Sequence, residues 1–538
     1  MRILVLLATV TVILSLGLGG IGVALAASGA ALPEEESERQ ASTQSPPVHA
    51  WQPHMALRLQ TSAARVDALR LQQHFSGHLG PWQFAALNER DPGERRWHDH
   101  VVGYVQRTSR RLDLAVGTLR PAFGQGLLFG RGMATGVPTP TVRRDDATLG
   151  YRSAAEARTI DGAAVRWRGA AWSGAVLAGV VRWDARVADE GIARALPDDG
   201  DHSGSGEAAR DRLHGSIAAG RWTLRAGRAQ AGFSVQRTVF ARRIDLRGSE
   251  TPYAFRGRQL TSAAADAKGH LGVLRWYAAV ARAGHRTAGL AGLSGMSAAG
   301  LRVDVLGRCY TAGFFSPLGA AASGAEMNNE RGLTLQARAG RRWRFWADLM
   351  QRPVPRWRQP LPTHRRAAGV RGTTRIGRWQ CRADLQQRVN SAWIGAAAGD
   401  ETTIRARLQG VRSQGRLRLT LSADGVGYRR DLRRASAPGR RGVSGSAAIR
   451  WQPARLQVNG LLSLFHTDGY ATRVYQYEPQ LPGAVSIRPL YGKGLRLVAV
   501  CSTRLGCLQV GVRWRLQAAA TGVQHVAAVQ LETLHRSR

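Results

Sequence analysis

Cysteine is scarce in this chain of 538 residues, and the few cysteines lie far apart or outside any metal-binding spacing. No C-x-x-C pair occurs, which excludes the common zinc and redox motifs. Four scattered cysteines are also too few for a disulfide framework. They are Cys309, Cys381, Cys501 and Cys507, and we assign none of them a chemical role.

Long apolar runs are missing after the N-terminus, because an Arg, Asp, Gln or Gly interrupts every candidate. A membrane helix needs about 18 or more such residues, so any membrane span in the main part of the chain must be a strand. The one long run extends from Ile3 to Leu18, follows Arg2 and precedes Ala24-Leu25-Ala26. This pattern predicts a secretory signal peptide at residues 1–26, with an uncleaved membrane anchor as the alternative.

Large apolar side chains are also rare in residues 27–54, where acidic residues from Glu34 to Glu38 precede a stretch of Ser, Thr, Gln and Pro. This composition predicts a disordered acidic and polar linker. Beyond it no further linker divides the chain. Residues 55–534 are therefore predicted to form one large domain.

That domain shows a repeated alternation of polar and apolar residues. In residues 402–427, Arg405 and Arg407 alternate with Ile404 and Leu408, and the alternation restarts after Gly415. A period of two indicates the two arms of a β-hairpin. Similar runs recur along the chain at about the ten-residue length of a tilted membrane strand.

The recurrence predicts an all-β fold, a transmembrane antiparallel β-barrel of roughly 18 to 24 strands. In the run from Leu456 to Leu464, we expect Leu462 and Leu464 to face lipid while Gln457 and Asn459 face the interior. Tryptophans near the ends of the predicted strands fit the aromatic girdles of such a barrel. They are Trp82, Trp167, Trp183, Trp222, Trp276, Trp343, Trp379, Trp451 and Trp514.

The net charge is +39, and all but two of the 76 basic residues, Lys268 and Lys493, are arginines. The arginines recur on the polar phase of the predicted strands rather than in a basic tail or a single helix. In a membrane barrel that phase faces the lumen. The candidate lumen-facing residues are Arg382, Arg405, Arg407, Arg416, Arg418, Arg513 and Arg515.

Other motifs give weaker signals. The glycine-rich segment 116–130 lacks the phosphate-binding patterns, which favours a bent strand or an inward-folded loop. Carboxylates between Ala188 and Ala209 lack calcium-loop spacing and predict a solvated external loop. His98, Asp99 and His100 are adjacent, but spacing indicates no third metal ligand. We therefore predict no catalytic residue, no metal site and no cofactor.

Four segments resemble a known family: Leu119–Gly132, Phe255–Gly269, Phe315–Leu333 and Arg473–Leu497. They are similar to the barrel region of a bacterial outer-membrane family that often carries N-terminal helix-hairpin-helix repeats of the competence-type DNA-binding class. The resemblance covers roughly Met55 to Trp514 and implies an outer-membrane barrel without catalytic residues. Residues 27–54 leave no room for the repeats, so the chain departs from the family there.

Together these patterns predict an exported outer-membrane protein that acts as a channel or transport-related barrel, with an Arg-rich lumen that favours anionic solutes. Two alternatives remain: a barrel for DNA uptake or surface DNA binding, and a structural or adhesive surface protein with a plugged lumen. A basic lumen attracts small anions and nucleic acid alike, so charge does not separate the first two. The expected partners are outer-membrane lipid and the barrel-assembly machinery.

Overall fold

The computed structural model describes residues 52–533, with gaps at 62–68, 95, 132–137, 139, 141–142, 144, 146–147, 154–157, 198–201, 203–205, 249–250, 321–326, 357–358, 395–396, 433–434, 437, 483–485 and 520–521. The predicted signal peptide and nearly all of the predicted linker lie outside these residues. Among the described residues no helix is long and apolar enough to cross a membrane.

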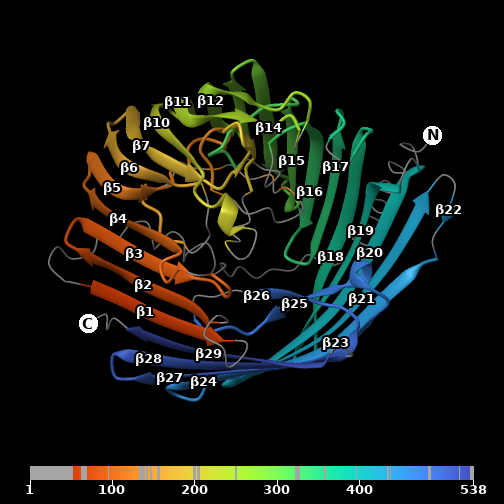
Figure 1. Ribbon diagram of the computed structural model, residues 1–538. Helices are drawn as coiled ribbons and strands as arrows, with labels where there is room; N and C mark the ends of the chain where they lie inside the picture. Colours follow the sequence, from red (N-terminus) through yellow and green to blue (C-terminus); the bar gives the residue numbers. More distant parts are fainter. Residues whose placement is uncertain are drawn as a thin grey trace. The chain divides into compact units, whose positions relative to one another are not determined.

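Twenty-four of the described strands form a closed antiparallel β-barrel, as the alternation predicted (Figure 1). Each barrel strand pairs with the next barrel strand along the chain, and β1 pairs with β29 to close the ring. The barrel strands are β1 (Gln52–Thr61), β2 (Leu69–Leu79), β3 (Trp82–Arg90), β4 (His100–Thr108), β5 (Leu112–Leu119), β6 (Ile160–Arg168), β7 (Trp172–Trp183), β10 (Leu213–Ala226), β11 (Ala229–Asp245), β12 (Arg256–Leu271), β13 (Leu274–Ala283), β14 (Arg286–Met296), β15 (Leu301–Tyr310), β16 (Glu330–Ala339), β17 (Trp343–Arg352), β18 (Thr363–Ile376), β19 (Trp379–Ile394), β20 (Ala397–Gln414), β21 (Leu417–Leu432), β23 (Arg440–Trp451), β24 (Leu456–Thr467), β27 (Lys493–Leu505), β28 (Leu508–Ala519) and β29 (Gly522–Thr533).

Short elements decorate the connections between these strands. The connection after β7 carries β8 (Arg186–Val187), β9 (Ala193–Ala195) and the 3₁₀ helix η2 (Glu207–Ala209). The connection after β21 carries β22 (Ala435–Ser436). The connection after β24 carries the 3₁₀ helix η3 (Tyr470–Thr472) and a separate hairpin of β25 (Val474–Glu478) and β26 (Ser486–Leu490).

The two ends of the barrel differ in their connections. At the end where β1 begins and β29 finishes, here the terminal rim, all connections are tight turns, such as Gly227–Arg228 and Gly415–Arg416. The glycines there have a φ of 55–56°, the arrangement of a type II′ hairpin turn, which a residue with a side chain adopts only with strain. The opposite end, here the loop rim, carries the long connections, including those after β5, β7, β15 and β24.

The outward face of the barrel is apolar. Leu408 is 62% exposed and Leu464 is 58% exposed, whereas their neighbours Arg407 and Ser463 point inward. In β24, Leu462 and Leu464 face outward, as the sequence predicted. In a water-soluble protein so extensive a surface of exposed Leu, Val and Ile would drive association, and in a membrane barrel it contacts lipid.

Five exposed tryptophans lie near the terminal rim, where strands leave or enter the short turns, whereas the exposed Trp97 lies between β3 and β4 at the loop rim. The five are Trp82, Trp172, Trp222, Trp343 and Trp451. Amphipathic rings at this level match the aromatic girdle of a membrane barrel. Trp183 departs from the expectation, because it is buried in the interior against Phe240, with ring centroids 5.3 Å apart.

The glycine-rich segment after β5 folds into the barrel interior, as one of its two sequence interpretations proposed. Phe123 and Phe129 are buried. Two hydrogen bonds join the segment to the connection after β15: Gly130 N donates to Leu318 O, and Ala320 N donates to Gly126 O. At Gly126 the φ is +86°, and a Cβ there would meet Ala320 O at 2.7 Å. Only glycine allows this close approach.

The lipid-facing register yields a stability prediction. Replacing Leu408 by Arg places a charge in hydrocarbon, at a cost of about 2–4 kcal/mol near the bilayer midplane. Gln409→Arg is the matched control, because Gln409 points inward and donates to Ser422 Oγ at 3.3 Å. Guanidinium unfolding in lipid vesicles, followed by tryptophan fluorescence, measures both variants. A greater loss for Gln409→Arg than for Leu408→Arg would show that the two faces are reversed.

Candidate functional site: the arginine-lined inner wall

Four arginines stand directly opposite one another on neighbouring strands of the inner wall. Arg302 of β15 pairs with Arg338 of β16, Arg338 with Arg344 of β17, and Arg344 with Arg371 of β18. Paired residues of an antiparallel sheet point to the same face, so the four guanidinium groups share one side of the wall. We call Arg302, Arg338, Arg344 and Arg371 the arginine row.

The ends of the arginine row have acidic partners, and its middle does not. Arg302 Nε donates to Asp304 Oδ1 at 3.0 Å, and Arg371 forms an ion pair with Asp384. Arg344 Nη2 instead donates to the neutral Gln336 at 3.0 Å, and no described carboxylate forms an ion pair with Arg338 or Arg344. The Nε atoms of both lack any described hydrogen-bond partner. Like charges directly opposite destabilise a sheet, so this region has unused capacity for an anion.

Beyond the row the same line of cross-strand neighbours alternates in charge. Asp384 of β19 pairs with Arg407 of β20, and Arg407 pairs with Asp424 of β21. Arg407 Nε donates to Asp424 Oδ1 at 2.5 Å, and Arg382 Nε donates to Asp384 Oδ2 at 2.6 Å. These arginines point inward but share their charge with carboxylates.

Arg405 and Arg407 also touch the β25–β26 hairpin inside the barrel. The Arg405 guanidinium lies 5.3 Å from the centre of the Tyr475 ring, and Arg407 Nη2 donates to Tyr475 O at 2.9 Å. A cation over an aromatic face is stabilised without neutralising its charge. Arg405 therefore keeps its positive charge at the lumen.

Two of the candidate arginines lie near the terminal rim. Arg418 of β21 pairs with Ser413 and shares the inward phase of Arg405 and Arg407. Arg416 is a correction to the sequence analysis: it is not on a strand but in the Gly415–Arg416 turn, because the hairpin reverses there. Arg416 and Arg418 therefore lie apart from Arg405 and Arg407, which are close neighbours along β20.

Arg513 and Arg515 of β28 surround a buried carboxylate supplied by the internal hairpin. Arg513 Nη2 lies 2.7 Å and Arg515 Nη1 4.0 Å from Glu478 Oε2, and Arg496 Nη1 of β27 lies 2.6 Å from Glu478 Oε1. Glu478 is fully buried. These arginines fasten the hairpin to the wall.

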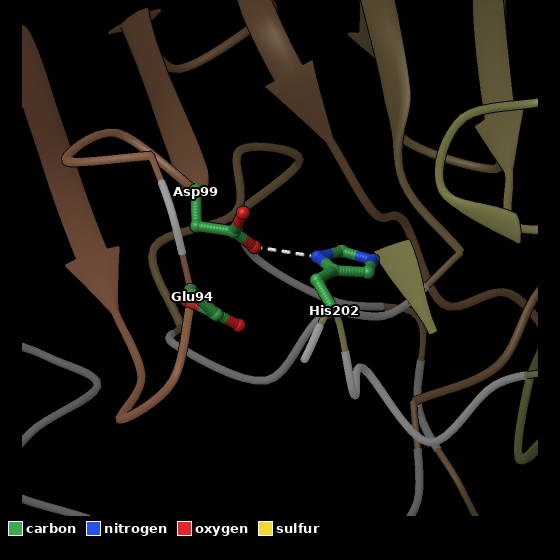
Figure 2. Close-up of side chains that lie close together, drawn as sticks. All are labelled: Glu94, Asp99 and His202. Atoms are coloured by element: carbon green, nitrogen blue, oxygen red, sulfur yellow. Dashed lines mark hydrogen bonds and ion pairs between the residues drawn. The ribbon is translucent and has the colours of Figure 1, made fainter. Parts of the chain in front are cut away.

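A second polar cluster lies at the loop rim and was missed by sequence reasoning. Glu94 and Asp99, from the connection between β3 and β4, meet His202 from the connection after β7 (Figure 2). His202 Nδ1 lies 2.5 Å from Asp99 Oδ2, and His202 Nε2 lies 2.8 Å from Asp184 Oδ2. The sequence showed His98-Asp99-His100 as a local motif, but only the fold brings in a histidine more than a hundred residues away.

Burial and hydrogen bonding shift the pKa values of two carboxyl groups here, Glu94 and Asp184, in opposite directions. Burial raises the pKa of Glu94 to about 7, and the nearby charge of Asp99 adds to the rise. The hydrogen bond that the Asp91 amide donates to the Glu94 carboxyl lowers this pKa, but it does not outweigh burial. Burial also acts to raise the pKa of Asp184, but hydrogen bonds from His202 and the Asp211 amide outweigh it and hold that pKa below its usual value. Asp99 and His202 line a cavity of about 460 Å³ together with Arg158, Arg182 and other residues of the loop rim.

Comparison with known proteins finds likeness in structure only. No family model matches the chain, and no curated protein matches it either. The siderophore receptor PirA of Pseudomonas aeruginosa aligns at 8% identity over 91% of this chain and 81% of its own, with a TM-score of 0.42.

Two further outer-membrane structures align over similar shares of the chain. The PapC usher translocation pore aligns at 11% identity over 90% of this chain and all of its own, with a TM-score of 0.37. OccK11 (OpdR) of Pseudomonas aeruginosa aligns at 10% identity over 90% and 94%, with a TM-score of 0.31. Likeness at this level identifies no substrate.

The buried carboxylate of the hairpin yields a second prediction. Glu478→Gln leaves Arg496 and Arg513 buried without a counter-charge, and we expect a loss of about 3–5 kcal/mol in the free energy of unfolding. The matched control is Glu401→Gln, which removes a partly exposed pair with Arg430 and should cost less than about 1 kcal/mol. Chemical unfolding of both variants in detergent measures the difference. Equal losses would mean that Glu478 does not hold the hairpin.

Proposed function

We propose that this chain is a transport-related barrel of the outer membrane whose inner wall favours anionic solutes. The observation that carries the proposal is the arginine row, where Arg338 and Arg344 face the interior without an acidic partner among the described residues. The barrel form, the apolar belt and the tight turns at the terminal rim support an outer-membrane setting, in which short turns lie on the periplasmic side.

Exposure of the inner-wall arginines differs from one part of the barrel to another. In the N-terminal half, the Arg221 side chain is 2% exposed and that of Arg308 is fully buried, each held between two carboxylates. On β18 and β19, Arg371 is 41% and Arg382 36% exposed, whereas Arg513 of β28 is 2% exposed. Water reaches the wall of β18 and β19, and we place the solute path along that side.

The field of the arginine row should depend on salt. Low-dielectric walls focus the field of fixed charges into an enclosed path, which raises the local concentration of counter-ions. Mobile ions screen that field over about 8–10 Å at 0.10–0.15 M. Anion preference is therefore expected to be greatest in dilute salt.

Planar-bilayer recording of the refolded protein tests this. Under a gradient of potassium chloride, the parent protein should give a reversal potential that indicates anion preference. The double variant Arg338→Gln, Arg344→Gln keeps polarity and approximate length, and it should move the reversal potential toward cation preference. The matched control, Arg416→Gln with Arg455→Gln, removes the same charge from turns of the terminal rim and should leave it nearly unchanged.

Two outcomes would refute the proposal: no conductance in the parent protein, or an equal reversal potential in the double variant and the parent. The nucleic-acid alternative is examined in the same recording by adding a single-stranded oligonucleotide. A block of current that the double variant abolishes would assign the row to a polyanion rather than to small solutes, because both are recognised through negative charge.

A further inference from the structure

The cluster at the loop rim has the composition of a metal site. Glu94, Asp99 and His202 each offer one ligand atom, and these atoms lie within 4.8 Å of one another. All three residues are buried. They come from two connections that are otherwise separate in the sequence, after β3 and after β7.

The residues around the three ligand atoms are those that orient metal ligands. His202 directs Nδ1 to the cluster while Nε2 lies 2.8 Å from Asp184 Oδ2, so a carboxylate fixes the orientation of the ring. Arg210 binds the other carboxylate oxygen of Asp99. Metal-bound histidines nearly always have such a partner on the second ring nitrogen, and metal-bound carboxylates are themselves hydrogen-bonded.

Ion pairs within the chain neutralise Asp99 and Asp184 but not the carboxylate of Glu94. His202 and Arg210 supply two positive groups for Asp99 and Asp184. Glu94 Oε2 accepts a hydrogen bond from Asp91 N at 2.6 Å, and no described basic side chain forms an ion pair with Glu94. A buried carboxylate beside a second one, without a cation of its own, is a position that a divalent ion would neutralise.

The spacing suits a small transition-metal ion. Zinc binds nitrogen and oxygen ligands at about 2.0–2.2 Å, so two ligand atoms on one tetrahedral zinc lie about 3.4 Å apart. His202 Nδ1 and Asp99 Oδ2 would separate slightly from their present 2.5 Å, and the most distant pair would approach from at most 4.8 Å. Rotations of the side chains supply such shifts.

We propose that Glu94, Asp99 and His202 bind one divalent transition-metal ion of the zinc class, and that the ion clasps the connection after β3 to the connection after β7 at the loop rim. The imidazole ligand favours zinc over the calcium and magnesium that all-oxygen sites select. Three protein ligands leave a fourth position open to the adjacent cavity, where water or a solute group can bind.

Calorimetric titration of the EDTA-treated, detergent-folded protein with zinc chloride tests the site. We expect saturable binding of one equivalent, weaker binding of manganese, and little binding of calcium. His202→Ala and Glu94→Gln should each weaken zinc binding by at least 100-fold. Asp184→Asn changes a positioning residue, and it should weaken binding on the order of 10- to 100-fold.

His98→Ala is the matched control, because His98 lines the same cavity but lies outside the cluster. It should bind zinc as the parent does. Zinc should also protect the connection after β7 from protease in the parent and in His98→Ala, but not in His202→Ala.

Heat-modifiable gel migration shows which variants are folded, and the nearly isosteric Glu94→Gln serves if His202→Ala does not fold. Absence of saturable zinc binding by the parent would overturn the proposal. Equal affinity in the parent and Glu94→Gln would overturn it too, since a cluster held only by ion pairs, or zinc bound elsewhere, predicts that result. The readouts are independent of conductance, so failure here leaves the proposed transport function untouched.

Discussion

The structure depends on the hydrogen-bonded seam between its first and last strands. In lipid every backbone amide and carbonyl must find a partner within the protein, so a sheet can span a membrane only when it has no free edge. Here β1 and β29 close the ring through six residue pairs, from Ala56↔Glu532 to Thr61↔Ala527. The seam is short, and the internal hairpin supports it from within. Pro482 O, between β25 and β26, accepts hydrogen bonds from Arg58 Nη2 of β1 at 2.6 Å and Gln530 Nε2 of β29 at 3.1 Å.

Closure also fixes which side chains face inward, and the inward arginines are accommodated in two ways. Around the interior of the N-terminal half, loop segments pack against the wall and the arginines are enclosed between carboxylates. Arg308, for example, contacts both Glu330 and Asp348. On β16 and β17, the half-buried Arg338 and Arg344 stand side by side without that compensation. Water lowers the cost of such a pair, and the repulsion that remains is what an anion would relieve.

The sequence predicts those features that depend on residues close together in the chain. The alternation around Arg407 and Leu408 indicated strands. Its recurrence predicted a barrel of roughly 18 to 24 strands, and the observed number, twenty-four, lies within that range. The arginine row was out of reach, because Arg302 and Arg338 are neighbours only through the register of β15 on β16, across a long connection. Arg416 was wrongly assigned to a strand, because periodicity does not show which residues form a two-residue turn. His202 joins Glu94 and Asp99 through tertiary folding alone.

The inward loops follow from the size of the barrel. Interior width grows with strand number, and barrels of more than twenty strands enclose a space that side chains alone cannot fill. In this chain the connections after β5, β15 and β24 enter that space. Hydrogen bonds, apolar packing and ion pairs join them to one another and to the barrel strands. They pack on the inner faces of the N-terminal strands and of the seam, and they leave inward arginines partly exposed along the wall from β15 to β20, such as Arg302, Arg371 and Arg407. The same long connections that narrow the interior therefore also determine which of its inward-facing arginines remain exposed to water.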